Sequence, residues 1–90
     1  MKNLQGSRLK NSSYMKNYTR DSGVGLPEII VLAARLRERE GYRTSLKRIP
    51  YILHMRLQYW TLEKIGNKYG LQRERISQLE MKGVEMIRGG

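Results

Sequence analysis

Residues 62–80 read LEKIGNKYGLQRERISQLE, and this stretch decides the fold. Apolar residues recur at helical spacing on both sides of Gly70, at positions Ile65, Tyr69, Leu71, Ile76 and Leu79. Gly66 is small enough to let a second helix approach the first closely, and Gly70 permits the positive φ of a short turn. The stretch therefore predicts a helix-turn-helix, a unit that places its second helix in the major groove of DNA.

The boundaries of this unit follow from its capping residues. Thr61 is a good N-cap, so the first helix begins at Leu62 and ends near Tyr69. The second helix begins near Arg73 and reaches Arg88. We therefore place the helix-turn-helix at residues 61–88.

The second helix has one apolar and one polar side at about 100° per residue. Helix-turn-helix proteins enter the groove with the N-terminal half of this helix. The outward residues of that half are Arg73, Glu74, Ser77, Gln78 and Met81. Lys82 and Arg88 follow where the helix leaves the groove, so we expect them near phosphates.

Two earlier helices complete the predicted domain. The first begins near Leu26, with Pro27 and Glu28 in its first turn, and Gly41 ends it. Its apolar stripe, which we expect in the core, consists of Leu26, Ile29, Ile30, Leu32, Ala33 and Leu36.

The other early helix begins near Ile49, because Pro50 interrupts any helix that starts earlier. Its apolar contacts are predicted at Tyr51, Ile52, Met55 and Leu57, while Arg56 faces outward. We expect Trp60 to pack at the corner that follows.

The composition narrows the possible functions. Lys and Arg outnumber Asp and Glu by 18 to 8, and the net charge of +10 on 90 residues favours a polyanionic partner. The sequence has no cysteine, which excludes disulfides and thiolate metal sites and makes a reducing cytoplasm the default. The sequence has no apolar run long enough to suggest a membrane segment. No nucleophile–base pair, phosphate-binding glycine loop or metal cluster supports an enzyme, so we predict no catalytic residue, cofactor or metal.

The sequence thus predicts an all-α fold, with a small helical domain at residues 25–90 that ends in the helix-turn-helix. Residues 1–24 carry Asn, Ser, Gly, Lys and Arg without a sustained apolar period. We interpret them as a basic, flexible arm that touches phosphates or a protein partner, or is merely solvated.

The segments TLEKIG at 61–66 and GLQRERISQLEMK at 70–82 resemble region four of the primary bacterial sigma factors. That family reads approximately T-L-E-E-I/V-G, a turn, and then T-R-E-R-I/V-R-Q-I-E-A-K. The likeness runs without gaps and extends more weakly back through RIPYILHMRLQ at 48–58. Residues 1–25 show no such likeness. The resemblance implies a recognition helix that reads the promoter −35 element.

By position, the resemblance implies base contacts by Arg73, Glu74 and Gln78. Ser77 lies among them and replaces an arginine of the family, and we include it in the predicted base-contacting set. The predicted phosphate contacts are Arg56, the backbone N–H of Leu62, Arg75, Lys82 and Arg88.

The family also docks on the flap of the RNA polymerase β subunit through apolar residues of its earlier helices. The resemblance therefore implies a second, apolar surface on this chain. The predicted polymerase-docking residues are Ile29, Ile30, Ala33, Ile52 and Leu53.

The leading hypothesis is a stand-alone transcription regulator, encoded by a phage or mobile element, because the other sigma domains are missing from the sequence. It would bind promoter-like double-stranded DNA, RNA polymerase or both in the bacterial cytoplasm at the nucleoid, with a monomer favoured. Two alternatives stay open. One is an inhibitor that displaces the host's region four without reading DNA, and the other is a dimeric operator-binding repressor that pairs through the helix at 26–40.

Overall fold

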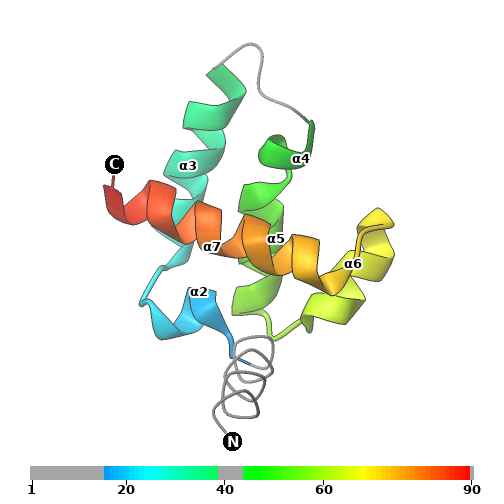
Figure 1. Ribbon diagram of the computed structural model, residues 1–90. Coiled ribbons are helices and arrows are strands. Elements are labelled where there is room, and N and C mark those ends of the chain that lie inside the picture. The colour runs from blue at the N-terminus through cyan, green and yellow to red at the C-terminus, as the bar shows by residue number, and fades with distance from the viewer. Residues whose placement is uncertain (1–15, 39–43, 90) are drawn as a thin grey trace, which may run out of the picture.

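The computed structural model describes residues 16–38 and 44–89, and all regular structure in these two ranges is helical. The helices are α2 (Tyr18–Asp21), α3 (Leu26–Glu38), α4 (Thr44–Lys47), α5 (Ile49–Leu57), α6 (Leu62–Tyr69) and α7 (Arg73–Gly89). The long helix α7 crosses α3 and α5, while α6 lies at its N-terminal end and α2 lies along its lower side (Figure 1). The predicted all-α fold is confirmed.

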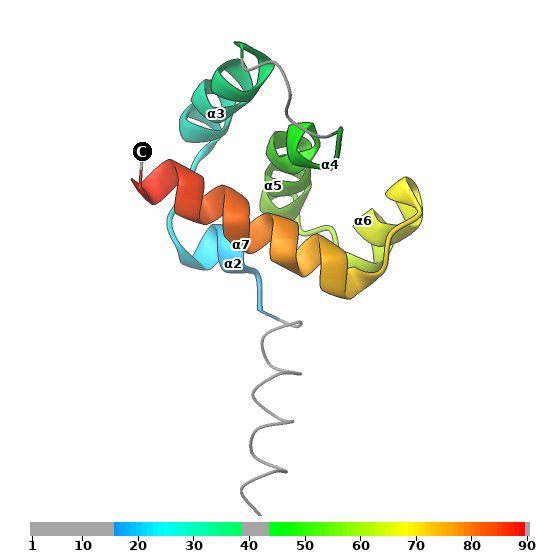
Figure 2. The same ribbon diagram turned by 45° about the horizontal axis from the view of Figure 1, so that its top comes forward.

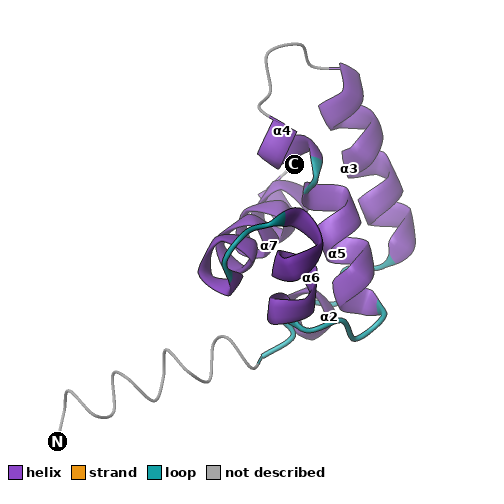
Figure 3. Cartoon of the chain, turned by 90° about the vertical axis from the view of Figure 1, so that its right-hand side faces the viewer, coloured by secondary structure: helices purple, strands orange, loops and turns teal. Residues whose placement is uncertain are grey.

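Helix α5 occupies the middle of the core. Ile49, Ile52 and Leu53 are fully buried because α5 packs against α3, α6 and α7 together. Figure 3 shows α5 beside α3, with α6 and α7 on its other sides. The neighbouring helices contribute Ile29, Leu32, Leu36, Ile65, Ile76, Leu79 and Val84 to the same cluster.

The helix-turn-helix forms as the sequence predicts. Thr61 caps α6, and its hydroxyl accepts a hydrogen bond from the Lys64 N–H at 3.0 Å. Gly70 ends α6 in the left-handed region with φ +69°. The Leu71 N–H then donates to the Gly66 carbonyl at 2.8 Å. The turn therefore closes directly over Gly66, where the backbone leaves no room for a side chain.

Helix α3 differs in part from its prediction. Ile29, Leu32 and Leu36 are buried, but Leu26 is 45% exposed and Ile30 is 59% exposed. The predicted apolar stripe is wider than the arc of α3 that the other helices cover, so these two residues lie outside the core. Tyr51, also predicted as a core contact, is 58% exposed on α5 for the same reason. The predicted stop at Gly41 lies outside the described residues.

The N-terminal boundary of the domain lies earlier than predicted. Asn17 caps the short helix α2, Thr19 is fully buried, and Val24 joins the hydrophobic core. Residues 16–24 are therefore part of the folded domain, although the sequence pattern assigns them to the predicted arm of residues 1–24. The rest of that arm, residues 1–15, lies outside the described part of the chain. Figure 2 shows α2 tucked against the underside of α7.

Gly66→Ala provides a test of the close approach between α6 and the turn. A Cβ at position 66 would lie 2.4 Å from the Leu71 carbonyl oxygen, whereas a Cβ at Gly89 would meet nothing within 4 Å. Because the obstacle is backbone, we expect Gly66→Ala to lower the free energy of unfolding by about 2 kcal/mol or more. Gly89→Ala, the matched control, should change it by less than about 1 kcal/mol. Chemical denaturation measures both, and equal effects would contradict this account of the turn.

Candidate nucleic-acid interface

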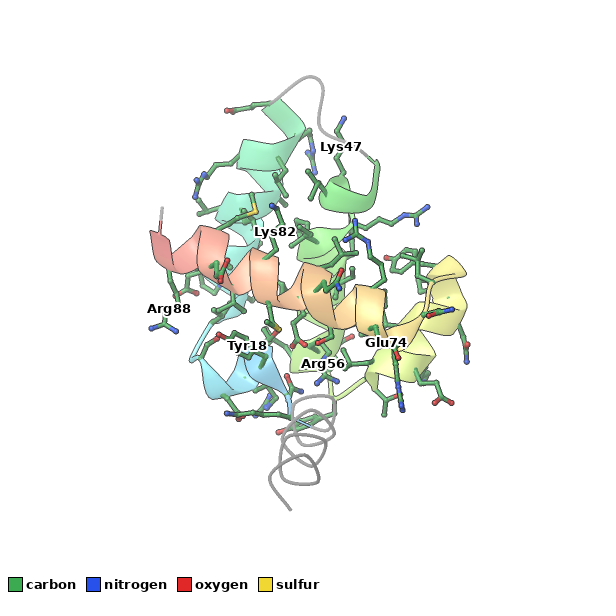
Figure 4. All side chains as sticks on the ribbon, in the orientation of Figure 1. Tyr18, Lys47, Arg56, Glu74, Lys82 and Arg88 are labelled. Atoms are coloured by element: carbon green, nitrogen blue, oxygen red, sulfur yellow. The ribbon has the colours of Figure 1, made fainter. Side chains whose placement is uncertain are left out.

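The outward side of α7 presents polar side chains in its N-terminal half. Arg73, Glu74, Arg75 and Gln78 are all exposed, and Met81 follows them with 39% exposure. Arg75 Nη1 donates to the Gln78 side-chain oxygen at 3.4 Å. Glu74 projects from the N-terminal end of the helix in Figure 4. The structure thus brings together three of the four residues predicted to contact bases.

Ser77 is the exception among these residues. It is only 8% exposed, and its hydroxyl contacts the Met81 sulfur at 3.9 Å. Ser77 shares its side of α7 with Glu80 and Val84, which follow it by three and seven residues and are buried. The prediction that Ser77 points outward is therefore wrong, because position 77 lies at the edge of the buried arc.

A surface hollow opens at the N-terminus of α6. Its walls are formed by Arg56, Thr61, Leu62, Glu63, Lys64, Asn67 and Arg73. The Leu62 side chain is buried, so only its backbone can face an incoming ligand. The first N–H groups of a helix favour an anion, and Lys64 and Arg73 add positive charge at this end. The hollow has the chemistry to receive a phosphate, with Glu63 as the one acidic group among the described residues that line it.

Arg56 lies behind this hollow in a buried network, contrary to the prediction that it faces outward. It is 4% exposed. Its Nε donates to Glu80 Oε2 at 3.1 Å, its Nη1 to the Trp60 carbonyl at 2.6 Å and its Nη2 to the Lys16 carbonyl at 2.7 Å. These bonds explain the burial, because each guanidinium nitrogen has a partner inside the protein. Figure 4 shows Arg56 below α7, between α2 and α6.

Glu80 completes the network and was not predicted as a special residue. It is 1% exposed. Its Oε2 accepts from Arg56 and also from the Thr19 N–H at 3.0 Å and the Thr19 hydroxyl at 2.7 Å. The sequence does contain a signal, since Glu80 lies one turn after Ile76 and next to Leu79, on the apolar side of α7. An acidic residue in that place indicates a buried cationic partner.

The other predicted phosphate contacts lie on the surface. Arg75 and Lys82, seven residues apart, share one flank of α7, and Arg88 lies in its last turn. All three are exposed, and Figure 4 shows Lys82 and Arg88 along the C-terminal half of the helix. Their contact with phosphates stays a prediction.

The predicted polymerase-docking residues divide into two groups. Ile29, Ile52 and Leu53 are between 0% and 3% exposed and belong to the core, so they are wrong as docking residues. Ile30 is exposed and Ala33 is half-buried. These two line an open, mostly apolar groove between α3 and α5, together with Leu26, Ala34, Arg37, Pro50, Tyr51 and His54.

Tyr69 is the described residue whose pKa departs clearly from its ordinary value. Burial raises the pKa of its hydroxyl, the positive charge of Arg48 opposes that shift, and Tyr51 adds to it. The Arg48 guanidinium carbon lies 4.9 Å from the Tyr69 ring centre. Tyr69 is the last residue of α6, so this contact joins the C-terminal end of α6 to Arg48. With its pKa raised, the Tyr69 hydroxyl stays neutral at physiological pH.

Residues 50–89 match the family model described as Sigma-70, region 4. This segment is therefore similar to region 4 of the sigma-70 factors. The match covers α5, α6 and α7, somewhat less than half of the chain, and leaves α2, α3 and α4 outside it. The searches of curated proteins and of solved structures returned no match.

Region 4 is a helix-turn-helix domain of transcription, so this match indicates a DNA-binding, transcription-related function. It is a regulatory rather than an enzymatic family. Two further findings concern only residues 16–38 and 44–89. No helix there is long and apolar enough to cross a membrane, and no group of three or more potential metal ligands occurs.

Glu80→Gln tests the buried network. The substitution removes a charge but keeps the shape, which leaves the Arg56 guanidinium buried beside a neutral amide. We expect the free energy of unfolding to fall by about 3 kcal/mol. The double variant Arg56→Met with Glu80→Gln removes both charges and should lose less than the sum of the two single substitutions. Urea denaturation of all four proteins measures this coupling, and strict additivity would contradict the network.

Proposed function

We propose that this protein regulates transcription by binding promoter DNA of the −35 type through α7. The observation that carries the proposal is the exposed row of Arg73, Glu74 and Gln78 on the recognition helix of a region 4 unit. Each side chain suits a base edge: arginine pairs with guanine, glutamate accepts from cytosine and glutamine pairs with adenine. The row stands in the half of the helix that enters the groove.

The surroundings of α7 support binding to a duplex rather than to a small anion. The hollow at the N-terminus of α6 adjoins one flank of the recognition helix through Arg73. Arg75 and Lys82 line another flank. Positive charge on both sides of a groove-reading helix matches the two phosphate strands that border the major groove. The net charge of +10 also favours binding to the negatively charged duplex.

The groove between α3 and α5 supports a second partner, the flap of the RNA polymerase β subunit. Leu26, Ile30 and Tyr51 are between 45% and 59% exposed around it, which is unusual for large apolar side chains on so small a domain. Arg37 and His54 border the groove and can hold polar groups at its edge. The groove lies on α3 and α5, so occupying it leaves α7 open to DNA.

A flap-bound inhibitor is the second candidate, and the burial of Ser77 favours it. The family has an arginine at that position, so this chain presents one positive, groove-facing group fewer. Such an inhibitor would use the α3–α5 groove to displace the host's region four, and its activity would not depend on Arg73 or Gln78.

The DNA-reading proposal is tested by Gln78→Ala and Arg73→Ala on the intact chain. Each should lower affinity for a −35-type duplex by about fivefold or more and reduce its preference over a scrambled duplex. Ser77→Ala is the matched control, because its hydroxyl is shielded and its loss should leave the preference unchanged. Fluorescence anisotropy at fixed salt measures all three. If transcription is still altered by the Arg73→Ala, Gln78→Ala double variant, the inhibitor is the better account.

The polymerase proposal is tested by Ile30→Asp, with Val31→Asp as control. The two residues are neighbours on α3 and are 59% and 58% exposed, but only Ile30 lines the groove. A carboxylate in the groove should reduce capture of core RNA polymerase at least tenfold, because burying an unpaired charge costs more than about 1.4 kcal/mol. Val31→Asp should leave capture unchanged. Equal capture of polymerase with and without its β flap tip would remove the flap from the proposal.

A further inference from the structure

An exposed pairing of basic and aromatic side chains lies at the corner between α5 and α6. Arg20 of α2 stacks on Tyr59, and Lys64 of α6 lies over Trp60. We propose that these four residues, named here the corner ledge, bind the DNA backbone beyond the hollow at α6. This inference rests on the proposed DNA binding and adds a contact that α2, outside the region 4 match, supplies.

Arg20 is held in one place although it is exposed. Its guanidinium carbon lies 4.1 Å from the centre of the Tyr59 ring, and its Nη1 donates to the Leu57 carbonyl at 3.0 Å. A guanidinium has five N–H donors in a rigid plane, so this single bond leaves donors for an outside acceptor. Stacking fixes the plane, which lowers the entropy lost when a phosphate binds.

Tyr59 supports a binding role through its exposure. It has φ +68° and is the one non-glycine residue with positive φ in the described part of the chain. Its side chain is 70% exposed. The left-handed conformation ends α5, because the Tyr59 N–H donates to the Arg56 carbonyl and the Trp60 N–H to the Met55 carbonyl, both at 3.0 Å. The turn leaves the Tyr59 ring on the surface, where Arg20 stacks on it.

The corner ledge is continuous with the hollow at the N-terminus of α6. Lys64 belongs to both, because it lines the hollow and its Nζ lies 4.3 Å from the Trp60 ring centre. Behind them, Arg56 binds the carbonyls of Trp60 and Lys16 and so fixes the start of α2 against the corner. The acidic residues beside this surface are Asp21 on α2 and Glu63 on α6.

The position of α2 along α7 places the corner ledge where the phosphates of a bound DNA strand would lie. Arg73 borders the hollow, and Glu80, seven residues later, binds Thr19 of α2. Seven residues are about two turns, so α2 lies on the same flank of α7 as the hollow, about 10 Å farther along. A strand that passes the α6 N-terminus while α7 occupies the groove would therefore run next past α2.

Arg20→Gln in the intact chain tests the corner ledge, with Lys47→Gln as control. Both remove one positive charge, but Lys47 lies on α4 at the opposite end of the domain (Figure 4). For Arg20→Gln we expect weaker binding to every duplex and a slope of log K against log salt that is smaller by about one. The preference for a −35-type over a scrambled duplex should not change. Lys47→Gln should leave the slope as it is in the wild type.

Tyr59→Gly separates the stacked geometry from the charge. Glycine accepts the positive φ, so the backbone at the corner is relieved, and no charge is lost. If stacking positions Arg20, this variant should also bind all duplexes several-fold more weakly. Thermal unfolding of Arg20→Gln and Tyr59→Gly shows whether each variant is folded at the temperature at which its DNA affinity is compared with that of the wild type.

The salt slopes, polymerase capture and duplex affinity together separate the corner ledge from the other proposals. Equal salt slopes for Arg20→Gln and Lys47→Gln would overturn the corner ledge while leaving groove reading by α7 in place. If Arg20→Gln lowers capture of RNA polymerase but not DNA affinity, the ledge is a protein contact and the proposal is wrong. A wild-type chain that binds no duplex at all would overturn both this inference and the proposed DNA binding.

Discussion

The buried carboxylate of Glu80 is the interaction on which the rest of the structure depends. One of its oxygens accepts hydrogen bonds from the Thr19 N–H, the Thr19 hydroxyl and Arg56 Nε, at 2.7 to 3.1 Å. Removing two charges from water costs several kcal/mol per ion, and only good geometry with further hydrogen bonds repays it. Here the three hydrogen bonds come from two distant places in the chain, Thr19 and Arg56. The pair therefore specifies how α2, α5 and α7 meet, rather than adding stability alone.

This constraint also explains how the surface is divided. The Arg56 guanidinium is buried and bonds only to groups of the protein. The exposed positive charge nearby therefore comes from Lys64 and Arg73 at the hollow and from Arg20 on the neighbouring α2. The polar surface thus lies along α7 and the α5–α6 corner. The apolar groove of Leu26, Ile30 and Tyr51 lies between α3 and α5. Partners of opposite chemistry can then be bound without competing for one surface.

Most of the helix-turn-helix could be predicted from sequence because its signals are local. A capping threonine, a close-approach glycine and a left-handed glycine each act within a few residues. Arg56, Ser77 and Ile30 were misplaced because their burial depends on distant parts of the chain. Arg56 is buried by residues 24 and 40 positions away, and no periodicity contains that information. Ile30 is exposed because α5 covers only part of the stripe that its spacing describes. An acidic residue on an apolar helix side, Glu80, was the signal that could have revealed the network.

The segment that matches region 4 does not contain a complete core. Helix α5 buries Ile49, Ile52 and Leu53 against α3 as well as against α6 and α7. Within residues 50–89, the Glu80 carboxylate would keep Arg56 but lose both bonds from Thr19. The folded unit must therefore include α2 and α3, although neither carries the family's sequence pattern. Since α2 is required to bury Glu80, its outer residues are fixed beside the recognition helix. A structural requirement of the interior thereby fixes the place of Arg20, which is why the proposed DNA contact of α2 depends on the buried Glu80.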